Sequence, residues 1–258
     1  DDHNENSKTF VAWNWLAGTA FSNDASATSV GTIDSSGQVN TEAGFSIVKY
    51  TGNTTAGATV AHGLSSAPEF IITKNRDAST AWHVYYGDAT DYLVLNTTAA
   101  TADSAASGWN DVAPTSSVFS LGASNPSNAN QDIAYCFHSV EGYSKVGSYV
   151  GNGSTDGPFV YTGFRPSLIL AKETGNARNW FISYDDGTYY NGLTHSLFPN
   201  ITQTEDAYSG SESGGGGRLD FLSNGFKLRT TSTTWNNSSG NYIYMAFAAQ
   251  PFKYANAR

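Results

Sequence analysis

The chain contains an internal repeat, and this repeat constrains the fold more than any other feature of its 258 residues. Residues 68–74 (PEFIITK) match residues 166–172 (PSLILAK) at an offset of 98, and Trp82 matches Trp180 at the same offset. Further segments of the first copy recur in the same order in the second copy: 50–53 as 149–152, 62–64 as 162–164, 118–121 as 225–228, and 133–137 as 243–247. Ordered self-similarity indicates one structural unit built twice, so we expect two similar domains.

Each copy reads as short strands separated by tight turns. Residues 45–50 and 81–86 are aromatic or β-branched and are bounded by Gly, Asn, Asp or Ser. Residues 70–72 and 168–170 are continuous apolar triplets, which is typical of strands buried on both faces. Many short strands with frequent turn signals favour a β-sandwich. We therefore predict an all-β protein with two tandem β-sandwich domains, jelly-roll or concanavalin-like, that arise from the internal repeat.

The repeat also predicts the domain boundaries. We interpret residues 44–142 as the first sandwich and residues 143–258 as the second. Residues 1–9 are polar and are expected to form an arm or linker. Residues 10–43 are expected to supply N-terminal strands, either a remnant of a preceding repeat or a completion of the first sandwich. Within them, residues 10–15 read like the closing strand of a copy.

Charge and polarity argue against several classes of function. The chain has 13 Lys and Arg and 22 Asp and Glu residues, a net charge of −9, and 14% charged residues where about 25% is usual. Nucleic-acid binding needs clustered Lys and Arg, so we expect no nucleic-acid partner. No apolar run reaches the ~18 residues of a spanning helix, so we expect no membrane insertion. With 14% aromatic residues the chain should fold.

A single cysteine, Cys136, permits no intrachain disulfide. Its apolar surroundings predict a small buried side chain rather than a nucleophile. Stability is then expected from core burial, from oligomerisation or from both. The chain begins at Asp1, which fits either a processed protein or a fragment of a longer one.

Catalytic and metal-binding patterns are weak. Asp185 and Asp186 form the densest carboxylate pair, but adjacent carboxylates on a strand point to opposite faces, so we interpret them as part of a solvated β-turn. The five histidines show no metal-ligand spacing, and no nucleophile elbow or phosphate loop occurs. We predict no catalytic residue, no metal site and no cofactor, and leave calcium open because several loops are rich in Asn and Asp.

Carbohydrate recognition is the kind of site that the composition favours most. Sugars are bound by aromatic faces together with neutral polar groups. The candidate exposed aromatic residues, in polar and loop-like surroundings, are Trp109, Tyr189, Tyr190, Tyr208 and Trp235. The other four tryptophans lie in strand-like runs and are predicted to be in the core or an interface: Trp13, Trp15, Trp82 and Trp180.

Several longer segments carry a resemblance to a known family. They are residues 44–53, 60–64, 67–76, 142–145, 147–153, 163–166, 222–229 and 246–258. Together they resemble a repeat module of bacteriophage tail-fibre and other virion structural proteins, of the marine-phage type, which often adjoins concanavalin-like or laminin-G-like domains. The resemblance runs from about residue 44 to the C-terminus, and it carries over no catalytic or ligand-binding residue.

The resemblance implies a non-enzymatic protein of the virion surface, or an extracellular one. We expect a tail-fibre or receptor-binding subunit that contacts a host-surface glycan or protein. Its partners would be copies of itself in a homo-oligomer, for example a trimer, and other virion proteins. A capsid decoration protein or a filament-forming structural subunit is the alternative, and a polysaccharide depolymerase is the second alternative.

Overall fold

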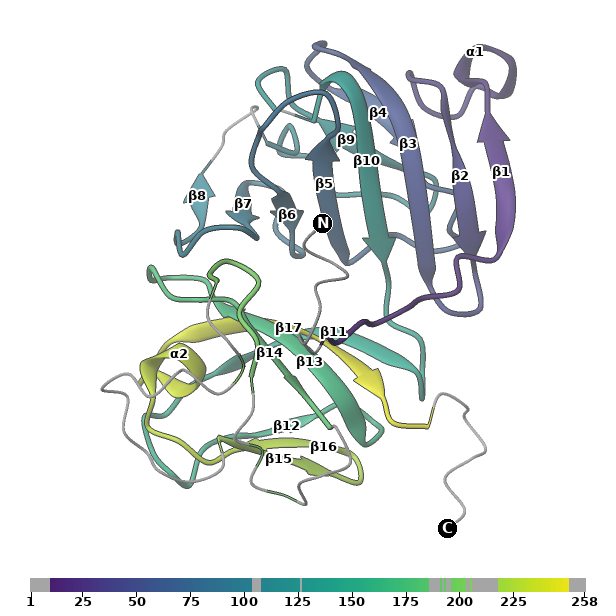
Figure 1. The fold of residues 1–258 in the computed structure, drawn as a ribbon. Helices are drawn as coiled ribbons and strands as arrows, with labels where there is room; N and C mark the ends of the chain where they lie inside the picture. Colours follow the sequence, from purple (N-terminus) through teal and green to yellow (C-terminus); the bar gives the residue numbers. More distant parts are fainter. Residues whose placement is uncertain are drawn as a thin grey trace.

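The computed structural model describes residues 10–103, 108–125, 127–185, 191, 193, 196–202, 205 and 218–250. These residues form several antiparallel β-sheets with two single-turn helices (Figure 1), which confirms the predicted all-β class. The N-terminal elements are β1 (Thr19–Asn23), α1 (Ala25–Thr28), β2 (Ser35–Asn40), β3 (Phe45–Asn53), β4 (Ala58–Ala61), β5 (Phe70–Asn75), β6 (His83–Tyr85), β7 (Asp91–Val94), β8 (Ala102–Asp103), β9 (Val118–Leu121) and β10 (Ala129–Phe137). The C-terminal elements are β11 (Ser144–Val150), β12 (Phe159–Tyr161), β13 (Pro166–Glu173), β14 (Phe181–Tyr184), β15 (Leu219–Leu222), β16 (Gly225–Leu228), α2 (Thr233–Asn236) and β17 (Asn241–Ala248).

Two large sheets and two small sheets are found among the described residues. The N-terminal half contributes an eight-stranded sheet, in the order β1-β2-β3-β10-β5-β6-β7-β8, and the pair β4-β9. The C-terminal half contributes a four-stranded sheet, β11-β17-β13-β14, and a three-stranded sheet, β12-β16-β15. Elements β3 to β10 and β11 to β17 therefore share one strand order, since β3-β10-β5-β6 and β11-β17-β13-β14 correspond position by position.

Among the described residues, three hydrophobic clusters hold these sheets together. The first core lies between the eight-stranded sheet and β4-β9 and includes Val48, Ile71, Phe119, Leu121 and Cys136. The second core lies between the four-stranded and three-stranded sheets and includes Ile169, Phe181, Phe226, Trp235 and Tyr242. The central cluster lies between the two large sheets and includes Phe45, Phe70, Phe137, Leu170, Trp180, Met245 and Phe247. The two large sheets thus pack against each other, in the middle of the molecule (Figure 1).

The alternation of side chains along a strand explains how each large sheet serves two clusters. Successive residues of a strand point to opposite faces of its sheet. On β17 the second core takes Tyr242, Tyr244 and Ala246, and the central cluster takes Ile243, Met245 and Phe247. The predicted burial of residues 168–170 on both faces is confirmed, because all three are buried.

The N-terminal segment differs from its prediction. Residues 10–18 form no strand, so the closing strand predicted at residues 10–15 is wrong. The segment instead lies at the junction of the two large sheets, and the Trp15 ring centroid lies 6.1 Å from that of Phe137 and 5.3 Å from that of Phe247. Aromatic packing therefore replaces the strand pairing that the sequence pattern indicated.

Strands β1 and β2 form one edge of the eight-stranded sheet, and they extend it past the area on which the four-stranded sheet packs. On β2, Val39 packs on the first core, so Ser36 and Gln38 face the opposite side, the side of the central cluster. No residue of β1 or β2 belongs to the central cluster as the described residues form it. This part of the sheet face is therefore left uncovered by the four-stranded sheet.

Candidate functional site

The predicted exposed tryptophans are buried, which corrects the prediction for both. Trp109 is 1% exposed in the first core, where its ring lies 5.6 Å from that of Tyr85. Trp235 is fully buried in the second core, 5.2 Å from the ring of Phe181. Both residues sit in polar segments that fold back over a core, so the polarity of their neighbours in sequence was misleading. The remaining candidates, Tyr189, Tyr190 and Tyr208, lie outside the described residues.

Four tryptophans were predicted to lie in the core or an interface. Trp180 is one of them, and it is fully buried in the central cluster, as expected. Its indole N–H donates a hydrogen bond of 2.9 Å to the carbonyl of Val94, in the other half of the chain. Trp13 and Trp15 pack against the same cluster and are partly buried. Trp82 is half-buried and lies outside the strands. These side chains therefore mostly join the two halves.

The remaining chemical candidates have structural roles. The carboxylate of Asp185 accepts a hydrogen bond of 2.9 Å from the guanidinium of Arg165, and Asp186 lies outside the described residues. Cys136 is fully buried as predicted, and burial raises the pKa of its thiol to about 12. Within the described part of the chain, no three His, Cys, Asp or Glu side chains gather as metal ligands would. No described helix is long and apolar enough to cross a membrane.

The exposed aromatic side chains of the described strands lie on β12. Phe159 is 46% exposed and Tyr161 is 65% exposed, and Val160 between them is buried. A side-chain carbon at Gly225 would lie only 2.9 Å from the Phe159 ring, so glycine leaves room for that ring on the neighbouring strand. The pattern Phe-Val-Tyr carried this information in the sequence, because alternation places both aromatic residues on one face.

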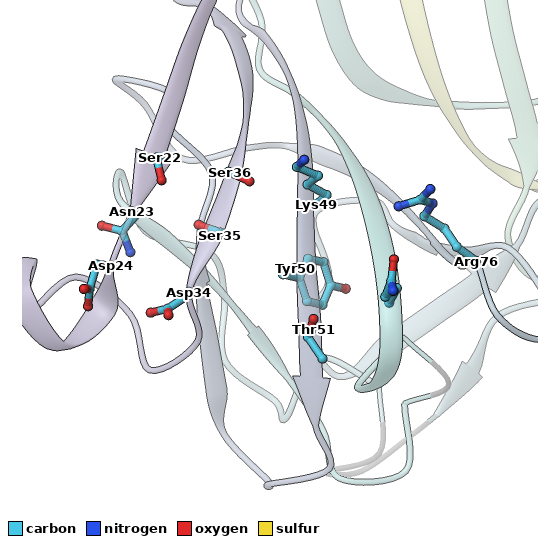
Figure 2. Close-up of a pocket in the computed structure, with 11 residues that line it drawn as sticks. Ser22, Asn23, Asp24, Asp34, Ser35, Ser36, Lys49, Tyr50, Thr51 and Arg76 are labelled. Atoms are coloured by element: carbon cyan, nitrogen blue, oxygen red, sulfur yellow. The ribbon is translucent and has the colours of Figure 1, made fainter.

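A polar groove of about 300 Å³ lies on the uncovered face of the eight-stranded sheet (Figure 2). Strand register forms its floor, because Ser22 pairs with Ser36, Ser36 with Lys49, and Lys49 with Ile133. Hydroxyl, amide and charged groups from four strands and two adjoining loops thus line one hollow. The lining residues are Ser22, Asn23, Asp24, Asp34, Ser35, Ser36, Lys49, Tyr50, Thr51, Arg76 and Gln131.

One end of the groove is acidic, and its carboxylates hold the helix α1. Asp24 caps this helix, accepting the backbone N–H groups of Ser26 at 3.0 Å and Ala27 at 3.1 Å. The Ser26 hydroxyl and the Ala27 N–H also keep the pKa of Asp24 below its usual value. Asp34 accepts the N–H of Ala25 at 2.8 Å. This end of the groove is therefore ordered by the chain's own hydrogen bonds.

The other end of the groove is basic. Figure 2 shows Lys49 on β3 and Arg76 beyond the next strand, with the guanidinium of Arg76 extending toward β3. The backbone N–H of Arg76 donates a hydrogen bond of 2.8 Å to the carbonyl of Gln131, which fixes Arg76 beside β10. Lys49 and Arg76 also line an adjoining hollow of about 460 Å³, together with Phe21, Ile47 and Ile133.

This groove was not predicted from the sequence. Its residues come from positions 22 to 131, and only the pairing of β1, β2, β3 and β10 brings them together. One local signal was present, because Lys49 stands between Val48 and Tyr50, two residues of the first core. Alternation therefore places Lys49 on the opposite face of the sheet. The sequence did not indicate that this face is open to solvent.

The fold and the groove together define an antiparallel all-β protein with a polar groove on a sheet face. The chain belongs to the family described as a domain of unknown function (DUF7483), whose model matches residues 1–251. No curated protein and no solved structure matches the chain.

Proposed function

We propose that the chain is a non-enzymatic glycan-binding protein of a bacteriophage virion surface, a tail-fibre or receptor-binding subunit. The observation that carries the proposal is the polar groove on the eight-stranded sheet. Its floor and rim offer hydroxyl groups from Ser22, Ser36 and Thr51 and an amide from Gln131, groups that pair with sugar hydroxyls. The resemblance to tail-fibre modules supplies the virion context.

The position of the groove supports recognition rather than chemistry. Its floor consists of hydrogen-bonded strands, which hold side chains more rigidly than a loop does. Its two carboxylates, Asp24 and Asp34, both accept backbone N–H groups of α1, so they serve to order the chain. A rigid polar surface of this kind fits a ligand that is bound and left unchanged.

We further propose that the two halves are copies of one β-sandwich unit, as the repeat predicted. Matching hydrogen bonds support this. The Tyr50 hydroxyl donates to the carbonyl of Ser127 at 2.9 Å, and the Tyr149 hydroxyl donates to the carbonyl of Trp235 at 2.8 Å. Tyr50 and Tyr149 belong to matching segments of the two copies.

The residues that follow these acceptors match as well. Asn128 is fully buried, accepts the N–H of Asn53 at 3.1 Å and donates to the carbonyl of Gly122 at 3.0 Å. Asn236 is also fully buried and accepts the N–H of Asn152 at 2.8 Å. Asn128 thus holds the loop after β3, and Asn236 holds the loop after β11. A duplicated unit accounts for both networks.

The test is binding of the purified protein to a glycan array and to host cells. Ser36→Phe places a ring on the groove floor and is expected to abolish binding. Thr59→Phe is the control, because Thr59 is half-buried on β4 and Phe159 occupies the matching position of the second copy. Thermal unfolding should show that both variants fold. Absence of binding by the unaltered protein, or equal binding by Ser36→Phe, would refute the proposal.

A further inference from the structure

We propose that the ligand of the groove is an acidic glycan, and that Lys49 and Arg76 together hold the carboxylate of one sugar. This inference rests on the proposed glycan-binding function and names the substrate class of the same site. It depends on three observations: the two cations share one hollow, neither has an ion pair or side-chain hydrogen bond with any residue that the structure describes, and the opposite end of the groove is acidic.

Lys49 and Arg76 lie close enough to contact one carboxylate of a ligand. Lys49 lies on β3 and pairs with Ile133 of β10, and Arg76 is bonded through its N–H to the carbonyl of Gln131 on the same strand. Two strand spacings, about 10 Å, separate their backbones across the sheet, and the two residues from Ile133 to Gln131 add about 7 Å along it, so the backbones lie about 12 Å apart. Both side chains are long, and both line the groove and the adjoining hollow. They can converge on one carboxylate, with Arg76 able to form a bidentate contact.

Most other basic side chains of the described residues are engaged within the protein. Lys74 donates to the carbonyls of Ala78 and Thr80, for example, and Arg229 pairs with Asp220 at 2.6 Å. The further engaged residues are Arg165, Lys172, Arg178, Arg218 and Lys227. Within the described part of the chain, Lys49, Arg76 and Lys145 have neither an ion pair nor a side-chain hydrogen bond. Two of these three cations line the same groove.

The neighbouring carboxylates do not neutralise this pair. Asp77 follows Arg76 in sequence, but its Oδ2 accepts the N–H of Gln131 at 2.8 Å. No ion pair joins Lys49 or Arg76 to any described carboxylate. In a chain with a net charge of −9, two unpaired cations in one hollow present a local site for an anion.

The acidic end of the groove indicates which kind of anion fits. Asp24 and Asp34 would repel a ligand that carries negative charge along its whole length. A glycan with a carboxylate on one sugar and neutral hydroxyl groups on the next avoids this repulsion. The carboxylate would lie at Lys49 and Arg76, and the neutral sugar would lie along Ser22 and Ser36.

The test compares polysaccharides with and without their carboxylates. Immobilised xanthan, in which a glucuronate lies between two mannoses, is offered to the full chain by biolayer interferometry, beside the same polymer after reduction of its carboxylates to alcohols. Alginate and polygalacturonate carry a carboxylate on every sugar, so they are expected to bind more weakly than xanthan. A sulfated neutral polymer, carrageenan, separates carboxylate from general anion binding. We expect the chain to bind xanthan, to lose that binding on carboxylate reduction, and to bind more weakly as salt is raised.

Substitutions then locate the site. Lys49→Gln and Arg76→Gln should each weaken binding about tenfold, as expected for loss of a charge-assisted contact. Lys145→Gln is the matched control, because it removes an equal charge outside the groove and should leave the affinity unchanged. Thermal unfolding checks that all three variants fold.

The outcomes separate this inference from the proposed function. Equal binding of intact and reduced polymers, or binding of carrageenan alone, overturns the acidic-sugar assignment and leaves glycan binding in place. Failure to bind xanthan while neutral glycans bind the array, or tighter binding of alginate or polygalacturonate than of xanthan, overturns it in the same way. Failure on both the polymers and the array refutes the proposed function as well. If Lys145→Gln weakened binding as much as Lys49→Gln and Arg76→Gln, the loss of affinity would follow from net charge alone, and the role of Lys49 and Arg76 would be overturned.

Discussion

Replacing Trp180 by alanine tests whether the two halves of the chain depend on each other for stability. The Trp180 side chain is fully buried in the central cluster, and its ring centroid lies 6.4 Å from that of Phe70 in the other half. Its indole N–H donates to Val94, also in the other half. Removing a buried tryptophan side chain costs about 3–5 kcal/mol, and the hydrogen bond contributes about 1 kcal/mol.

Trp180→Ala is therefore expected to lower the free energy of unfolding by about 4–6 kcal/mol, a large part of the ~5–15 kcal/mol that is typical of a folded domain. The measurement is urea unfolding followed by circular dichroism. Trp82→Ala is the matched control, because the sequence match at an offset of 98 pairs Trp82 with Trp180, but Trp82 is half-buried and lies outside the strands. Trp82→Ala should lower the free energy of unfolding by about half as much as Trp180→Ala, because less of its side chain is buried. A loss below about 1 kcal/mol for Trp180→Ala, or equal losses for both variants, would show that contacts between the two halves contribute little to stability.

Three further predictions concern the packing, pH response and loops of the same fold. Trp15→Ala should destabilise the chain by about 3 kcal/mol in urea unfolding, because Trp15 contacts rings of both large sheets; no change would mean that the N-terminal segment is not part of the packing. Burial lowers the pKa of His62 to about 4 from its usual 6.5, so the unfolded chain binds more protons between these values and stability falls as the pH drops through them, by about 1.4 kcal/mol per pH unit. Burial lowers the pKa of His83 to about 4 as well, so His62→Thr, which copies Thr162, should remove about half of the combined slope in unfolding measured from pH 4 to 7, and an unchanged slope would assign it to other groups. Asn128→Ala and Asn236→Ala should each cost about 2–4 kcal/mol in thermal unfolding, because each leaves buried backbone groups without partners; a clear difference between the two would argue against equivalent roles.

The strand content of the fold could be predicted because its signals are local. The apolar triplets at residues 70–72 and 168–170 lie in β5 and β13, and the segment at residues 45–50 lies in β3. Turn residues and alternation operate within a few positions, so a single sequence carries them. The class of the fold followed from these segments alone.

The stacking of the two large sheets could not be predicted in the same way. Phe45 and Phe247 lie on the face of each large sheet that is turned away from its own core, and this face is apolar as well. An apolar face packs equally well on another part of the chain or on another molecule, and only the three-dimensional arrangement decides. For the same reason, the apolar residues 10–15 read as a strand, although Trp13 and Trp15 in fact fill the space between sheets.

The candidate site was missed for a different reason. Trp109 and Trp235 were chosen because polar residues surround them in sequence, but burial depends on where a loop folds. Alternation placed Lys49 on the face opposite the first core, but it did not mark Lys49 or Arg76 as part of a site, since isolated basic residues on strands are common and usually solvated. Their significance depends on a sheet that is wider than the sheet packed against it, which is a property of the assembled fold.

The N-terminal segment joins the molecule at its centre, and this has a mechanical consequence. Trp15 is held between rings of both large sheets, and Trp13 lies 5.4 Å from the ring of Tyr184. A pulling force applied to the chain before Trp13 would load these rings before it reached the hydrogen bonds that pair β1 with β2. The force would be shared between the two halves, and strand β1 would not be peeled from the edge of its sheet.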